Sequence, residues 1–143
     1  MVDKIGSASW HGNLPGGHGL FKLDSSPAET KNAFKVQYDN ETGTNPEAML
    51  GAAQAGCYSL VLSMLLSRAG YEVKEIDTTA NVTVGNGPEG YGIQGIKLIT
   101  NATVDNISVD DFSKYLDEAK NTCLICKALS AVNIELEANL VNS

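Results

Sequence analysis

The chain has 143 residues, a length that suits one domain and lets folding bury roughly two-thirds of the surface that the unfolded chain exposes. Hydrophobic residues make up 43% of it and charged residues 19%, proportions that exclude a largely disordered protein. The net charge is −7 and Arg68 is the only arginine, which argues against nucleic acid as a partner because a phosphate backbone needs clustered Lys and Arg. We therefore expect a single domain over residues 1–143.

The cellular compartment is predicted from the first twenty residues and the cysteine count. Those residues contain no basic stretch followed by an apolar run, so we predict no secretory signal and a cytoplasmic location. Three cysteines, an odd number, argue against a structural disulfide framework in such a chain. Catalysis, metal binding and plain burial remain open as roles for the thiols.

The first forty residues alternate polar and apolar side chains as half-buried strands do. The alternation is found in residues 7–10 (SASW), 20–23 (LFKL) and 34–38 (FKVQY), which together predict an antiparallel meander. His11 and His18 lie among glycines, and we expect them in an exposed loop rather than at a metal or catalytic site.

A long helix is predicted next. Residues 43–47 (GTNPE) supply a capping Thr or Asn, a proline at the first helical position and an acidic side chain at the positive end of the helix dipole. The helical pattern stops at Gly70. Residues 49–66 are apolar enough to suggest a membrane span, but three polar residues interrupt them and no basic cluster flanks them. We favour a central helix covered by a sheet or by a partner subunit.

The second half of the chain predicts a hairpin, a helix and a last strand. Residues 75–84 and 91–104 alternate on either side of a Gly-rich turn. Ser108 begins a capping box for an amphipathic helix, and residues 132–140 alternate again. The order of three strands, a helix, two strands, a helix and a strand indicates an α+β fold.

Cys57 lies inside the apolar helical run, where a free cysteine is usually a small buried hydrophobe. The alternative is a reactive thiol near a helix N-terminus, whose dipole lowers the thiol pKa. Glu47 stands ten positions earlier, about 15 Å along a straight helix, so the two can share a site only if the helix breaks. We predict a break at Gly51 and Gly56, with a second helix beginning near Gly56.

Cys123 and Cys126 form a Cys-x-x-Cys motif before the last strand. Three interpretations are open: half of a zinc site, a redox dithiol, or one functional cysteine with a bystander. Zinc is disfavoured because no second paired motif is present, and a thioredoxin-like dithiol because the βαβ context is missing. We expect no metal.

Four segments in the same order resemble the OsmC/Ohr family of peroxide-detoxifying proteins, and its OsmC branch in particular. They are residues 43–47 (GTNPE), 50–59 (LGAAQAGCYS), 76–80 (IDTTA) and 119–123 (AKNTC). The resemblance implies an intertwined α+β homodimer, with antiparallel sheets wrapped around central buried helices and active sites at the subunit interface. It implies that Cys57 is the peroxidatic cysteine and Cys123 the resolving one. It also implies that no cofactor is needed and that an external dithiol of the lipoyl type resets the pair.

The resemblance also has departures. Glu47 matches the family glutamate that holds an arginine against the thiolate, but Gln37 stands where that arginine is expected. An amide supplies no full charge, so we expect the pKa of Cys57 to be lowered less than in relatives that keep the arginine. Leu124 replaces a usual proline and Cys126 a usual serine; we favour a bystander role for Cys126 over that of an alternative resolving thiol.

The function expected from these features is reduction of organic hydroperoxides, and more weakly of hydrogen peroxide, through a Cys57 sulfenate that Cys123 resolves. The alternative is a protein of the same fold that binds a small hydrophobic ligand or senses redox state with little turnover, because Gln37 replaces the family arginine.

Overall fold

A computed structural model describes residues 5–11, 18–23, 29–32 and 45–141. By its internal contacts the chain divides into two compact units, residues 1–49 and 50–143. The expectation of one domain over the whole chain stays a prediction.

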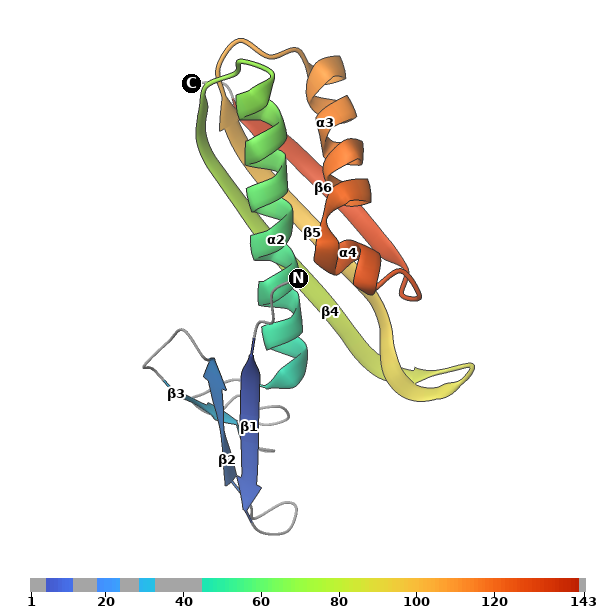
Figure 1. Cartoon of the computed structure of the whole chain (residues 1–143). Helices are drawn as coiled ribbons and strands as arrows, with labels where there is room; N and C mark the ends of the chain where they lie inside the picture. Colours follow the sequence, from blue (N-terminus) through green and yellow to red (C-terminus); the bar gives the residue numbers. More distant parts are fainter. Residues whose placement is uncertain (1–4, 12–17, 24–28, 33–44, 142–143) are drawn as a thin grey trace. The chain divides into compact units, whose positions relative to one another are not determined.

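The first unit contains a three-stranded antiparallel sheet in the order β1-β2-β3 (Figure 1). Its strands are β1 (Gly6–His11), β2 (His18–Leu23) and β3 (Glu29–Asn32). The first two strands and their antiparallel pairing confirm the first two strands of the predicted meander. The third strand was not predicted, because its sequence ETKN has no apolar alternation; the predicted strand at 34–38 lies outside the described residues.

The two histidines of this unit are not in a loop, and that expectation was wrong. His11 ends β1 and His18 begins β2, and the two are partners in the ladder register. The glycines around them suggested a loop, whereas the backbone pairing of the two strands includes both histidines.

Helix α2 (Pro46–Arg68) begins and ends as its sequence predicts. The Asn45 Oδ1 atom accepts a hydrogen bond from the Ala48 N–H at 2.8 Å, so Asn45 is the cap. At the other end Gly70 adopts φ +91°, a left-handed conformation that glycine adopts without steric cost. The Tyr71 N–H then donates to the Leu66 carbonyl at 3.0 Å and ends the helix.

The predicted break in this helix is absent: α2 is one helix of 23 residues that runs through Gly51 and Gly56. Gly51 serves close packing instead. A Cβ atom there would lie 3.1 Å from Val82 Cγ2 and 3.3 Å from the Ala80 carbonyl oxygen, so glycine lets the helix approach the sheet. Around Gly56 no atom lies within 4 Å of such a Cβ.

The second unit contains a second sheet in the order β4-β5-β6, made of β4 (Val73–Gly87), β5 (Gly90–Val104) and β6 (Ile134–Val141). The β4–β5 hairpin and the last strand confirm the predictions. However, β6 pairs parallel to β5, so the expectation of antiparallel sheets was wrong for this pair. The reason is the connection between the two strands. Helices α3 (Val109–Thr122) and α4 (Leu124–Ala128) return the chain to the end of the sheet from which β5 runs, so that β6 runs in the same direction as β5.

One face of this sheet is covered by α2, α3 and α4 (Figure 1). On α2 the fully buried side chains are Gln54, Tyr58, Leu62 and Leu66, which recur every four residues. They pack on alternate residues of β5, whereas the opposite face of the sheet is mostly polar and only partly exposed on β5. Among the described residues, α2 alone is long and apolar enough to cross a membrane by length and composition, with a mean hydropathy of 1.5. Its buried side chains make it the core helix of this unit.

Candidate active site

The site is built where the middle of α2 meets the junction between α3 and α4. Cys57 lies on α2 next to the buried Tyr58 and is itself half-buried. Cys123 ends α3, caps α4 and is fully buried. Its side chain interacts with the Cys57 thiol, although 66 positions separate the two residues in sequence. All three cysteines of the chain are free thiols.

The surroundings of Cys57 favour its thiolate. Partial burial raises the pKa of the thiol, but three hydrogen bonds outweigh it and hold the pKa below the ordinary thiol value. The donors are the backbone N–H of Ile125, the Cys123 side chain and the backbone N–H of Leu124. All three groups that lower the pKa of Cys57 belong to the second unit, and none of them is a positively charged side chain.

Cys123 has the opposite character. Its pKa is raised to about 12, mainly by burial and also by the side-chain hydrogen bonds with Cys126 and Cys57, against a lowering effect of the Cys126 N–H. That N–H lies 3.4 Å from the Cys123 sulfur. The pair therefore consists of one thiol biased toward the thiolate and one that keeps its proton.

Hydrogen bonds fix the elements that carry the two sulfurs. The buried Tyr58 hydroxyl donates to the Leu116 carbonyl on α3 at 3.1 Å, which joins the two helices directly beside Cys57. On the next residue, the Ser59 hydroxyl donates to Thr78 Oγ1 at 2.7 Å and ties α2 to β4. Cys57 thus lies on a helix that hydrogen bonds join to both α3 and β4. Such support keeps a reactive side chain in a fixed position.

Gln54 and the first turn of α4 belong to the site but could not be found from the sequence. Gln54 is fully buried, and its Nε2 atom lies 3.5 Å from the Cys126 sulfur. In the sequence, Gln54 is recognisable only as a polar residue in an apolar run, which does not show that it contacts Cys126. The N–H donors of Leu124 and Ile125 depend on a helical turn of five residues, too short to show any periodicity.

The other two predicted site residues do not join this cluster. Glu47 lies in the first turn of α2 and is partly buried. Because the helix does not break, ten residues of helical rise separate it from Cys57, about 15 Å. Gln37 lies outside the described residues. Among residues that the structure describes, no group of three or more His, Cys, Asp or Glu side chains could hold a metal ion.

Chemically, the arrangement is a nucleophilic sulfur with a second thiol in contact. A thiolate can attack an electrophilic atom and be oxidised, and a contacting thiol can then condense with it to a disulfide. The backbone N–H groups that favour the thiolate can also stabilise negative charge that develops on a leaving group.

Comparison with known proteins assigns the family. A model of the family described as OsmC-like protein matches residues 38–137. Peroxiredoxin OsmC of Escherichia coli is 34% identical over 131 residues, covering 91% of this chain and 92% of that protein. The organic hydroperoxide resistance protein-like 1 of Staphylococcus saprophyticus is 28% identical, covering 90% of each chain. The chain belongs to the OsmC-like family.

Solved structures agree with this fold. The organic hydroperoxide resistance protein OhrB of Bacillus subtilis superposes with a TM-score of 0.74 at 20% identity, covering 94% of this chain and 98% of that one. An OsmC-like protein of unknown function from Vibrio cholerae gives a TM-score of 0.76 at 14% identity, covering 99% and 100%. The predicted α+β, OsmC-like fold is therefore confirmed.

Proposed function

We propose that this protein is a thiol peroxidase that reduces organic hydroperoxides, and hydrogen peroxide more weakly, through Cys57 and Cys123. The observation that carries the proposal is the contact between a thiol of lowered pKa and a buried thiol of raised pKa at two distant positions of the chain. The names of the relatives, a peroxiredoxin and a hydroperoxide resistance protein, support a peroxidase-like role in general.

The proposed cycle has three steps. The Cys57 thiolate attacks the terminal oxygen of the hydroperoxide, so that the O–O bond breaks, the alkoxide takes a proton to leave as the alcohol, and the sulfur becomes a sulfenic acid. The Cys123 thiol condenses with it, losing its proton to the departing water and forming a disulfide. An external dithiol of the lipoyl type then returns both sulfurs to thiols and becomes a disulfide itself.

The apolar surface beside Cys57 supports an alkyl hydroperoxide as the substrate. Leu124, whose N–H donates to the Cys57 sulfur, has a side chain that is 71% exposed. A large exposed apolar side chain next to a reactive sulfur can contact the alkyl group of a substrate, an interaction that hydrogen peroxide lacks.

We propose supporting roles for two further residues. Because about 15 Å of α2 separates Glu47 from Cys57 in one subunit, in this proposal Glu47 orients Gln37 toward the site of the other subunit of the dimer. There the Gln37 amide donates a hydrogen bond to the peroxide or the thiolate. An amide supplies less electrostatic stabilisation than a guanidinium, so the backbone N–H donors of α4 contribute more to stabilising the Cys57 thiolate.

A homodimer in the cytoplasm is the proposed working state. The face of α2 opposite the core carries small and apolar side chains, among them Leu60, which is 71% exposed. A second copy of the same helix would cover this face, and a length of 23 residues allows an extended contact. A reducing cytoplasm would keep the three cysteines as thiols between turnovers.

The test is turnover of cumene hydroperoxide and tert-butyl hydroperoxide by purified protein with dihydrolipoamide as the dithiol. We expect repeated turnover that the Cys57→Ser variant lacks, and a faster reaction in Gln37→Arg if charge limits the first step. A single stoichiometric loss of thiols without turnover by any dithiol would favour a sensor over an enzyme. Unchanged thiols in the presence of hydroperoxide would refute the proposal.

A further inference from the structure

Cys126 interacts directly with Cys123. Its backbone N–H lies 3.4 Å from the Cys123 sulfur, and the two side chains also interact. Cys123 thus contacts one thiol on each side, Cys57 on α2 and Cys126 on α4. Two residues that are three apart at a helix start are within the reach of a disulfide.

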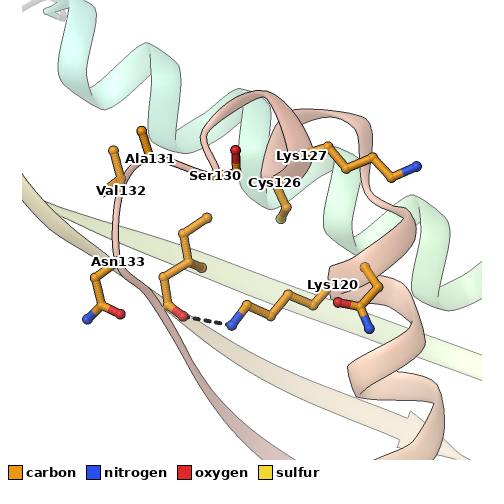
Figure 2. A pocket seen from close by; sticks show the side chains of 9 residues that line it. Lys120, Cys126, Lys127, Ser130, Ala131, Val132 and Asn133 are labelled. Atoms are coloured by element: carbon orange, nitrogen blue, oxygen red, sulfur yellow. Dashed lines mark hydrogen bonds between the residues drawn. The ribbon is translucent and has the colours of Figure 1, made fainter.

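Cys126 is buried, with 5% of its surface exposed, but it borders a pocket. It lines a pocket of about 460 Å³ together with Lys120, Asn121 and residues 130–134. Figure 2 shows these side chains around the pocket, with Lys120 held by a hydrogen bond of 2.8 Å to the Ile134 carbonyl. Cys123, by contrast, has no exposed surface.

We propose that Cys126 takes over the disulfide from Cys57 and Cys123 and presents it to the external dithiol at this pocket. The step rests on the proposed peroxidase cycle and follows the formation of the Cys57–Cys123 disulfide. The Cys126 sulfur attacks the Cys123 sulfur, the bond between Cys123 and Cys57 breaks, and Cys57 leaves as a thiolate that takes up the proton of Cys126. The number of disulfides does not change.

The chemistry of the three sulfurs favours this direction. In thiol–disulfide exchange the sulfur of lower pKa is the better leaving group. Cys57 has a lowered pKa and Cys123 a raised one, so attack on Cys123 expels Cys57 more readily than attack on Cys57 expels Cys123. Gln54, fully buried, donates a hydrogen bond of 3.5 Å to the Cys126 sulfur and so holds the attacking side chain in place.

The transfer would separate the two half-reactions in space. Hydroperoxide reacts on the side of Cys57 and Leu124, whereas the dithiol attacks the Cys126 sulfur from the pocket beside Lys120. The first thiol of the dithiol attacks Cys126 and forms a mixed disulfide, and its proton passes to the departing Cys123 sulfur, whose raised pKa makes it leave as a thiol. The second thiol of the dithiol then attacks the first, and Cys126 also leaves as a thiol. Cys57 is available for the next hydroperoxide before the dithiol arrives.

A quenched time course tests the transfer. Reduced protein is mixed with one equivalent of cumene hydroperoxide, quenched with acid and N-ethylmaleimide, and digested without reduction for disulfide mapping by mass spectrometry. In the unmodified protein we expect a Cys57–Cys123 disulfide that decays as a Cys123–Cys126 disulfide appears and Cys57 becomes alkylated. In Cys126→Ser we expect loss of the second species, while the first persists. If Cys126 is alkylated in full at every time point, the proposal is overturned.

A second measurement separates this proposal from the peroxidase proposal. The Cys57→Ser protein is equilibrated with dihydrolipoamide and lipoamide at a series of ratios and mapped in the same way. A Cys123–Cys126 disulfide that follows the ratio supports the dithiol site even if hydroperoxide oxidises nothing, in which case only the peroxidase proposal fails. No such disulfide at any ratio overturns the dithiol site. The time course of the unmodified protein decides the matter if Cys126→Ser does not fold.

Discussion

The role of Cys123 as a hydrogen-bond donor to Cys57 predicts the effect of its removal. Three groups lower the pKa of Cys57, and the Cys123 thiol is the one that mutation can delete without moving the backbone. A hydrogen bond to a charged group contributes about 1.5–3 kcal/mol, and a thiol is a weak donor, so we take the lower end. Since 1.36 kcal/mol corresponds to one pKa unit, Cys123→Ala should raise the pKa of Cys57 by about one unit.

The assay is the pH dependence of alkylation at Cys57. Iodoacetamide is added between pH 5 and 10, and the modification of Cys57 is followed by peptide mass spectrometry, which keeps it apart from Cys126. Only the thiolate reacts, so the rate rises with pH and levels off above the pKa. In Cys123→Ala the rise should occur about one pH unit higher than in the unmodified protein.

The matched control is Cys123→Ser, whose hydroxyl is a stronger donor in the same position. Its Cys57 should titrate at or below the pH found for the unmodified protein. If Cys123→Ala titrates like the unmodified protein, Cys123 is not a donor to the thiolate. If serine and alanine raise the pKa equally, the cause is disturbed packing at this buried position, and the reasoning from hydrogen bonds is refuted.

Three further predictions address the hydrogen bond that joins α2 to α3, the proposed dimer and the substrate. Tyr58→Phe, which loses the bond to Leu116, should lower the free energy of unfolding in urea by about 1 kcal/mol, and an unchanged midpoint would contradict this. Leu60→Lys should dissociate the dimer in sedimentation experiments, whereas Val109→Lys, at an equally exposed apolar site with 72% against 71% exposure, should not. Leu124→Gln should lower kcat/KM for cumene hydroperoxide roughly fivefold, for about 1 kcal/mol of apolar contact. An equal loss with hydrogen peroxide would argue against alkyl recognition.

Local patterns predicted most elements of the fold. Asn45 and Ser108 both cap helices as their positions indicate, with Ser108 accepting from the Asp111 N–H at 3.1 Å. The alternation in β4, β5 and β6 predicted all three strands, because one face of that sheet packs against the helices and the other is more exposed. These features depend on neighbours within four residues or on the two-residue alternation of a strand. Both can be read directly from the sequence.

The features that failed depend on distant parts of the chain. Gly51 looked like a helix breaker, but it is a contact point with Val82, thirty-one positions later, which no local pattern reveals. The parallel pairing of β5 and β6 depends on the path of α3 and α4 rather than on the strands themselves. A sequence gives residue types, whereas packing partners come from the folded chain.

The candidate site likewise has parts that the sequence predicted and parts that only the fold reveals. Cys57 and Cys123 were expected from a family resemblance, and their contact in the structure is a tertiary feature that no spacing could give. The break predicted at Gly51 and Gly56, which would have brought Glu47 toward Cys57, is absent because the helix is continuous. The position of Cys126, with Gln54 on one side and Cys123 on the other, could be recognised only in three dimensions.

The central claim is that hydroperoxide oxidises Cys57 and that Cys123 resolves it. The most direct measurement adds one equivalent of cumene hydroperoxide to Cys126→Ser protein, whose two remaining cysteines leave one possible intramolecular disulfide, and determines thiols, cumyl alcohol and cross-linked peptides together. The account predicts two thiols lost, one alcohol formed and a single peptide that joins Cys57 to Cys123. A Cys57 that stays a thiol, or a Cys57 sulfenate that persists beside an unreacted Cys123, would contradict it.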